Sequence, residues 1–248
     1  MTAGPLETLG GQPVELWRAQ YAYATAAAEL GFTAERHAPA TPNEVGDVAP
    51  VSVREAVADS PDFLTCQPSL VLRLGPCLPR SATVMFNVHL DTVSGIEPVS
   101  FDGTRFHGRG AIDAKGPAVA LLAGIREAVR ARPALGTEIA VLIQAVAGEE
   151  GGAMGVFGTR PLIQRGYVGR LNVFCEPTGR RALTRSTAAM TARLRVRGQD
   201  AIDDEPGAGH NATVLLGFLA QKLAAELGPA AVDGQVCVAG LHLSLIHI

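Results

Sequence analysis

The sequence predicts an α/β domain of three layers with a mostly parallel sheet, and three observations lead to that class. Short apolar runs of strand length alternate along the chain with longer runs of helical periodicity. Such alternation is typical of parallel sheets that are covered by helices on both faces. Polar side chains also gather where three of the apolar runs end, and open α/β sheets form their ligand sites at the carboxyl ends of their strands.

The individual elements follow from periodicity and from the residues that interrupt it. Apolar residues at three- and four-residue spacings predict helices, and Gly31 and Pro133 end the first two of them. Short and almost uninterrupted apolar runs predict buried strands. Helices are predicted over residues 14–30, 115–133 and 160–166, strands over 69–75, 82–90, 137–148 and 170–179, and a loop over 38–50.

Composition excludes several classes of protein. With 248 residues, 47% of them hydrophobic, the chain can form one large core or two modest ones. No apolar run is long enough to span a membrane and the first residues do not resemble a signal peptide, so we expect a cytoplasmic protein with no membrane partner. A formal net charge of -3 without a basic block argues against nucleic acid as a partner. The four widely spaced cysteines are expected to be ordinary buried thiols.

Two polar residues end the apolar stretch FNVHLDTVSG at residues 86–95. His89 and Asp91 are two positions apart, so they share one face if the strand geometry continues. A metal-bound imidazole usually has its other nitrogen held by a hydrogen bond, and a nearby carboxylate commonly accepts it. The pair alone is equally compatible with a structural histidine near a strand end.

Further acidic residues stand at comparable places. Asp113 lies in the glycine-rich turn GRGAIDAKG before a predicted helix, where it is also compatible with a cap or an anion-binding turn. Glu149 and Glu150 follow a buried strand, where adjacent carboxylates repel each other unless they share a cation or a proton. A solvated turn is the alternative for this pair. Glu176 ends another strand, before a proline that favours extended backbone.

Together, the segments HLDTV, GRGAIDAKG, GEEGGAMG and EPTG resemble the zinc amidohydrolase and aminopeptidase family, which includes acetylornithine deacetylase, succinyl-diaminopimelate desuccinylase, aminoacylase and glutamate carboxypeptidase. The resemblance covers roughly residues 84–179. It implies a zinc-peptidase catalytic domain that hydrolyses an amide bond of an N-acyl amino acid or a small peptide. It also implies two zinc ions per full-length subunit, with cobalt or manganese as substitutes.

The resemblance assigns four residues to the metals. His89 and Glu176 would bind one zinc ion, Glu150 would bind the other, and Asp113 would bridge the two. The family also tends to hold the peptide bond after the bridging aspartate in cis. A cis bond is therefore predicted between Asp113 and Ala114.

Two further residues are implied to be catalytic. Asp91 would orient the imidazole of His89. Glu149 would be the general base, which takes a proton from a water molecule and later delivers it to the leaving amine. The adjacent glutamates Glu149 and Glu150 thus need different roles, one free and one bonded to metal.

The resemblance also divides the chain into two domains. Residues 1–181 would form an incomplete catalytic domain, and residues 182–248 would form part of a lid that mediates homodimer formation. In the second domain, strand-like runs over 182–199 and 234–244 flank a predicted helix over 210–227.

Three features depart from the family. Ile202 takes the place of a lid histidine that stabilises an oxyanion, and the nearby His210 is expected to begin a helix instead. His242 and His247 lack the surroundings of the family's last zinc ligand. The terminal LSLIHI resembles a translated sequencing adapter, so we expect a truncated chain with weak or absent activity.

Two functions therefore remain open from the sequence. The first is a metal-dependent amidohydrolase that is impaired in this chain. The second is a noncatalytic, metal-poor homologue that binds a peptide or an acidic ligand, for which Ile202 is the main argument.

Overall fold

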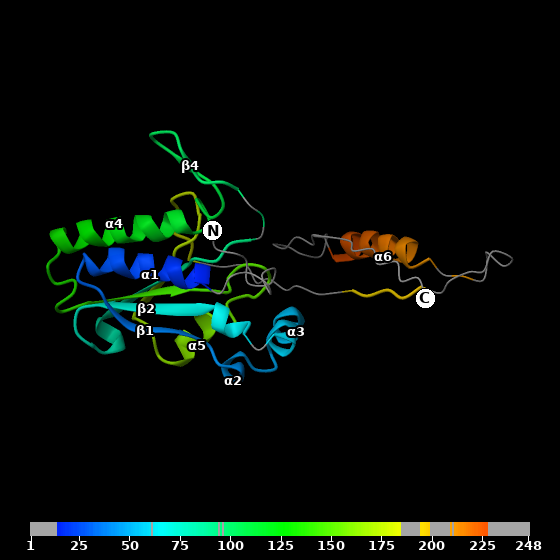
Figure 1. Cartoon of the computed structure of the whole chain (residues 1–248), viewed down its shortest axis with the longest axis horizontal. Helices are drawn as coiled ribbons and strands as arrows, with labels where there is room; N and C mark the ends of the chain where they lie inside the picture. The colour runs from blue at the N-terminus through cyan, green and yellow to red at the C-terminus, as the bar shows by residue number, and fades with distance from the viewer. Residues whose placement is uncertain are drawn as a thin grey trace. The chain divides into compact units, whose positions relative to one another are not determined.

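The computed structural model describes two units of the chain, Met1–Ala182 and Leu183–Ile248 (Figure 1). The residues that it describes are 14–60, 62–93, 95, 97–184, 194–198, 209 and 211–227. Among these residues, no helix is long and apolar enough to cross a membrane.

The first unit is built on a five-stranded sheet with the strand order β1-β2-β6-β3-β7. Its strands are β1 (Thr33–Pro39), β2 (Pro68–Leu74), β3 (Thr83–His89), β6 (Ala140–Val146) and β7 (Leu171–Phe174). Strand β3 runs parallel to both of its neighbours, β6 and β7. Strands β1 and β2 pair antiparallel, as do β2 and β6. The predicted α/β class is confirmed, with a sheet that is evenly mixed rather than mostly parallel.

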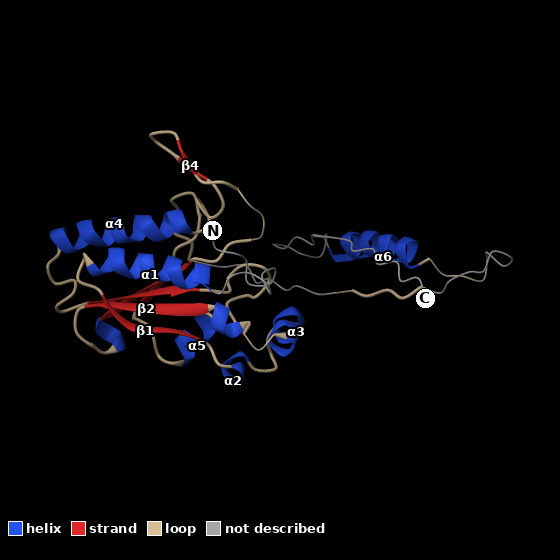
Figure 2. Cartoon of the chain, viewed as in Figure 1, coloured by secondary structure: helices blue, strands red, loops and turns tan. Residues whose placement is uncertain are grey.

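Helices cover both faces of this sheet and give it three layers (Figures 1 and 2). Helices α1 (Val14–Ala28) and α4 (Lys115–Ala131) lie on one face, and α5 (Thr159–Gln164) lies on the other. Because side chains alternate along a strand, each central strand contributes to both cores. Leu72 and Ile143 pack in the core under α1 and α4, whereas Val71 and Leu142 pack with Leu162 of α5.

The predicted loop over residues 38–50 is wrong in part. Strand β1 continues to Pro39, and a short helix α2 (Pro42–Val45) follows it. The helix begins with a capping box, in which the carboxylate of Glu44 accepts a hydrogen bond from the backbone N–H of Thr41 at 2.8 Å. The segment TPNE carries this signal, with a proline at the first helical position.

Smaller elements complete the first unit. They are α3 (Val51–Asp59), the 3-10 turns η1 (Leu64–Cys66) and η2 (Arg80–Ala82), and a hairpin of β4 (Ser100–Phe101) and β5 (Phe106–His107). The hairpin projects from the body of this unit close to α4 (Figure 1).

In the second unit, the predicted helix is confirmed as α6 (Ala212–Leu227). The side chain of Asn211 accepts hydrogen bonds from the backbone N–H groups of Thr213 and Val214 at the start of this helix. The predicted strand over residues 234–244 and most of the predicted strand over 182–199 lie outside the described residues.

An ion pair joins α2 to the end of α5, and we expect acid to break it and so to lower the stability of the first unit. Arg165 donates a hydrogen bond from Nε to Glu44 at 2.6 Å, and this bond is the main cause that lowers the pKa of Glu44 from 4.5 to about 2. A lowered pKa stabilises the fold above the ordinary value, and that stabilisation is lost as the pH falls towards 2. The free energy of unfolding is measured in urea at several acidic pH values. In Arg165→Gln this free energy should fall less steeply as the pH is lowered. Arg170→Gln, at an exposed arginine, is the control and should leave this pH dependence unchanged.

Candidate metal centre

The fold brings the predicted polar residues together at one edge of the sheet. Strands β6, β3 and β7 are parallel neighbours, so their carboxyl ends meet there. His89 is the last residue of β3, Glu149 and Glu150 follow β6, and Glu176 follows β7. Asp113 reaches the same place from the turn that precedes α4.

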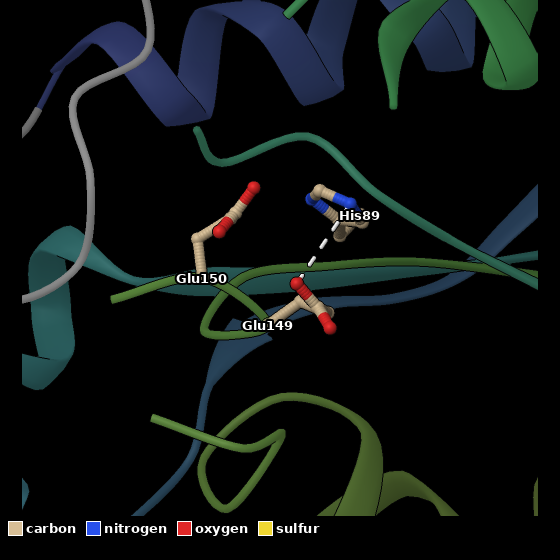
Figure 3. A group of neighbouring side chains, drawn as sticks. All are labelled: His89, Glu149 and Glu150. Atoms are coloured by element: carbon tan, nitrogen blue, oxygen red, sulfur yellow. Dashed lines mark ion pairs between the residues drawn. The ribbon is translucent and has the colours of Figure 1, made fainter. Parts of the chain in front are cut away.

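His89 is at the centre of this cluster, and four carboxylates surround its ring. Its Nε2 atom lies 2.9 Å from Oδ1 of Asp113, 3.7 Å from Oε2 of Glu176 and 3.9 Å from Oε2 of Glu149. Figure 3 shows the side chains of Glu149 and Glu150 beside His89, with the ion pair between His89 and Glu149 marked. The imidazole is fully buried, whereas the side chains of Asp113, Glu149 and Glu176 are between 37% and 49% exposed. The three carboxylates are therefore accessible to solvent, whereas the imidazole is not.

Asp91 lies behind the imidazole and is completely buried. Its backbone carbonyl lies 3.0 Å from Nδ1 of His89, and its carboxylate oxygen Oδ1 lies 3.7 Å from the same nitrogen. The other carboxylate oxygen accepts a hydrogen bond from the backbone N–H of Glu150 at 3.1 Å. Asp91 thus contacts both His89 and the loop after β6 that carries Glu149 and Glu150, called the glutamate loop below. The backbone carbonyl, which sequence motifs do not reveal, makes the shorter contact with the ring.

Glycine gives the glutamate loop its path after β6. Gly148 has a φ of 76°, and a Cβ atom there would collide with the ring of Phe157. The loop then closes on itself, because the backbone N–H of Gly155 donates to the carbonyl of Gly148 at 2.7 Å. The predicted cis peptide bond between Asp113 and Ala114 is confirmed.

The closely packed charged groups shift one another's pKa values. Burial lowers the pKa of His89, but the carboxylates of Asp91 and Glu176 outweigh it and raise the pKa to about 11. Burial raises the pKa of Glu149 and of Glu150, and neighbouring carboxylates raise both further. The site therefore favours added positive charge.

The donor set fits a divalent cation. Two groups of ligand atoms, His89 with Glu149 and Glu150, and His89 with Asp113 and Glu176, each lie within 4.8 Å of one another. Imidazole nitrogen with carboxylate oxygen suits zinc, cobalt and manganese. The buried oxygen Oδ1 of Asp91 has no hydrogen-bond partner in the described part of the chain, so its charge is free to act on the imidazole.

Three of the four cysteines lie in the described part of the chain. Cys175 precedes Glu176, and burial raises the pKa of its thiol to about 11, so it stays protonated at neutral pH. Cys66, Cys77 and Cys175 are free thiols, but Cys66 and Cys175 are only partly buried and Cys77 is exposed, so the prediction of buried thiols is wrong for Cys77. The other residues singled out from the sequence, Cys237, Ile202, His210, His242 and His247, lie outside the described residues.

Cation affinity should increase with pH. At neutral pH the raised pKa of His89 keeps the imidazole protonated, and a cation can bind Nε2 only after that proton leaves. One displaced proton gives about a tenfold gain in affinity per pH unit while the pH stays below the histidine pKa. Calorimetric titration with zinc, repeated in buffers of different ionisation enthalpy, measures both the affinity and the protons released. Affinity that is independent of pH would contradict this assignment.

Three comparisons with known proteins bear on this site. Residues 85–185 match the peptidase family M20/M25/M40. A protein from Aeropyrum pernix, provisionally named as a LysW-lysine/LysW-ornithine hydrolase, is 38% identical over 91 residues, which are 37% of this chain and 24% of that protein. The chain thus spans about a quarter of the length of this curated relative.

Solved structures are also similar to the chain. Human carnosine dipeptidase 1 is 20% identical with a TM-score of 0.43, and the match covers 68% of this chain and 36% of that one. The aminopeptidase PepT from Bacillus cereus is 17% identical with a TM-score of 0.34, over 62% of this chain and 34% of that one.

Proposed function

Because the chain belongs, through residues 85–185, to the peptidase family M20/M25/M40, we propose that it carries the catalytic site of a zinc-dependent hydrolase of amide bonds. The observation that carries this proposal is the convergence of four carboxylates on the buried imidazole of His89. Such a cluster of like charges is stable only with protons or cations among them.

Each residue has a part in holding the cations. His89 and Glu176 would hold one zinc ion, Glu150 would hold the other, and Asp113, whose Oδ1 lies 2.9 Å from Nε2 of His89, would contribute to both. Asp91 keeps the imidazole turned so that Nε2 points at the carboxylates. Zinc, when bound, would polarise the carbonyl of the substrate and lower the pKa of a water molecule.

Glu149 is the group that moves the proton. Its side chain is half exposed and lies beside the ligand cluster, with Oε2 3.9 Å from Nε2 of His89. Burial and neighbouring carboxylates raise the pKa of this glutamate, which brings it closer to the working pH of a group that must both accept and release a proton. Glu149 takes a proton from water as the amide is attacked and gives it to the leaving amine.

The proposed substrates are N-acyl amino acids or small peptides. The name of the Aeropyrum relative supports lysine or ornithine joined to another group as one candidate. Deacetylation of an acetylated amino acid is a further candidate within the same class. A noncatalytic peptide-binding homologue is not favoured, because the curated relative named above is a hydrolase.

The remaining proposals concern the whole protein. We assign residues 1–181 to the catalytic domain and residues 182–248 to part of a lid and dimerisation domain, in a cytoplasmic homodimer. The division of the chain into units at residues 182 and 183 supports this boundary. Sedimentation of the purified chain tests the dimer.

A combined assay of metal content and turnover tests the function. The protein is freed of metal with a chelator, reconstituted with zinc, cobalt or manganese, and assayed on N-acyl amino acids and dipeptides. We expect hydrolysis that depends on the added cation. Failure to bind zinc would support the noncatalytic alternative.

A further inference from the structure

Two buried carboxamides lie opposite each other on the inner strands of the sheet. Asn87 of β3 and Gln144 of β6 are direct partners in the register of these parallel strands, and the two residues are 5% and 0% exposed. Both point to the face that α5 covers, because Met85 and Leu142, two positions earlier on each strand, pack with Leu162 of α5. Burial of a polar group is costly unless hydrogen bonds satisfy it, and an apolar pair would avoid that cost.

Hydrogen bonds fix the orientation of both carboxamides. The nitrogen Nδ2 of Asn87 donates to Oε1 of Gln144 at 2.8 Å, and Nε2 of Gln144 donates to the backbone carbonyl of Tyr167 at 2.7 Å. A carbonyl oxygen only accepts, so Gln144 must turn its nitrogen to Tyr167 and its oxygen to Asn87. Asn87 must then present its own nitrogen to Gln144. Only one orientation of the two side chains therefore satisfies both bonds.

The nitrogen of Asn87 also reaches the end of the glutamate loop. It donates to Oγ1 of Thr159, the first residue of α5, at 3.2 Å. The glutamate loop begins after β6 and ends where α5 begins. Its last residue, Gly158, lies so close to β6 that a Cβ atom there would collide with the carbonyl of Ala147. The side chain of Asn87 thus binds β6 before the loop and α5 directly after it.

The backbone of Asn87 contacts the third strand of the site. Its carbonyl accepts a hydrogen bond from the backbone N–H of Cys175 at 2.9 Å, directly before the proposed ligand Glu176. His89 follows Asn87 by two positions, on the same face of β3. Asn87 is therefore in contact with all the strands that bring ligands to the site. Its backbone bond does not depend on the side chain, so the carboxamide itself acts on β6 and on the glutamate loop.

We infer that Asn87 is a positioning residue of the metal centre: its carboxamide, through Gln144 and Thr159, holds the glutamate loop where the carboxylates of that loop face the imidazole of His89. The inference rests on the proposed function for the identity of the cation that these groups receive. The hydrogen bonds that carry it do not depend on that function. Asn87 acts through the loop and is not itself a ligand.

Two substitutions at Thr159 test the inference on the intact chain. Thr159→Val removes the accepting hydroxyl with little change in size, whereas Thr159→Ser keeps it. We expect Thr159→Val to lower the zinc affinity by about tenfold, the lower end of the usual loss when a residue that supports a ligand is removed. Thr159→Ser should bind zinc as the unmodified chain does. Calorimetric titration with zinc measures both affinities.

Hydrogen exchange without any cation shows whether the effect is local. The backbone N–H of Gly155 donates within the glutamate loop at 2.7 Å, and that of Leu90 donates to the last residue of β6 at 3.1 Å. In Thr159→Val the amide of Gly155 should exchange about fivefold faster, the usual contribution of one hydrogen bond, while the amide of Leu90 is unchanged. A contribution to global stability alone would speed exchange at both amides.

A double-mutant cycle shows whether Thr159 acts through Asn87. The four proteins are the unmodified chain, Thr159→Val, Asn87→Leu and the double variant. In the Asn87→Leu background, Thr159→Val should have almost no further effect on zinc affinity or on the exchange of Gly155. Thr137→Val is the matched control, because the hydroxyl of this exposed threonine donates to backbone carbonyls in the turn before β6, and it should change neither quantity.

The outcomes distinguish this inference from the proposed function. Equal losses of zinc affinity in Thr159→Val and Thr159→Ser, or equally faster exchange at Leu90 and Gly155, would overturn the inference. If the unmodified chain binds no zinc, the proposed function fails, but a local and non-additive effect on exchange still shows that Asn87 holds the loop. Zinc binding that is unchanged in every variant would refute the inference and leave the proposed function standing. The Thr159 variants suffice for this test if Asn87→Leu does not fold.

Discussion

Replacing Glu149 by glutamine is expected to reduce amide hydrolysis by about 10²- to 10⁴-fold, the usual contribution of a general base. Glutamine keeps the shape of the side chain but cannot accept the proton from water. The affinity for zinc should stay close to that of the unmodified chain if Glu149 is, as proposed, the member of the glutamate pair that does not bind metal. Steady-state hydrolysis and calorimetric zinc titration on the same samples measure the two effects.

Glu138→Gln is the matched control for this variant. Glu138 is exposed and precedes β6, at the opposite end of the strand from Glu149. It should leave both hydrolysis and zinc affinity unchanged. If Glu149→Gln instead lost zinc and kept its activity per bound cation, Glu149 would be a metal ligand and the roles assigned to the two glutamates would have to be exchanged.

Replacing His89 by asparagine is expected to remove most of the cation affinity. His89 belongs to both groups of candidate ligand atoms and is the proposed imidazole ligand of the centre, so its loss removes a direct ligand. Since loss of an orienting residue alone costs about 10- to 100-fold, loss of a direct ligand should exceed that range. Zinc titration measures the loss, and circular dichroism checks that the variant still folds.

His107→Asn provides the control for the histidine variant. His107 lies on the exposed hairpin and pairs with Asp102 at 3.5 Å, away from the carboxylates that surround His89. It should bind zinc as the unmodified chain does. Retention of full affinity by a folded His89→Asn variant would show that the cation binds elsewhere.

The buried strands and long helices could be predicted because burial on both faces leaves a continuous apolar run. Strands β2, β3 and β6 have this pattern, and β6 is buried at every position. Strand β1 could not be predicted, because its sequence TAERHAP is polar and its residues are exposed or only partly buried. It forms because the edge of β2 offers hydrogen bonds, which a local pattern does not reveal.

The sequence did not predict the antiparallel half of the sheet, which β1, β2 and β6 form, for a related reason. Alternation of strands and helices indicates parallel pairing, and it holds for β3, β6 and β7. Strand β2 instead pairs antiparallel with β6, a strand that lies far along the sequence. Only the packing of the whole chain brings such distant segments together, so their direction cannot be read from either segment alone.

The residues of the site could be predicted from motifs, and their mutual arrangement follows from the order of the strands. Asp91 contacts His89 most closely through a backbone carbonyl, which every residue possesses and no motif records.

A crystal structure of the chain grown with zinc, with data collected above and below the zinc absorption edge, tests the central claim most directly. We predict an anomalous peak about 2.0 to 2.2 Å from Nε2 of His89 and from carboxylate oxygens of Asp113 and Glu176. A zinc peak only at other residues, with this cluster holding none, would contradict it.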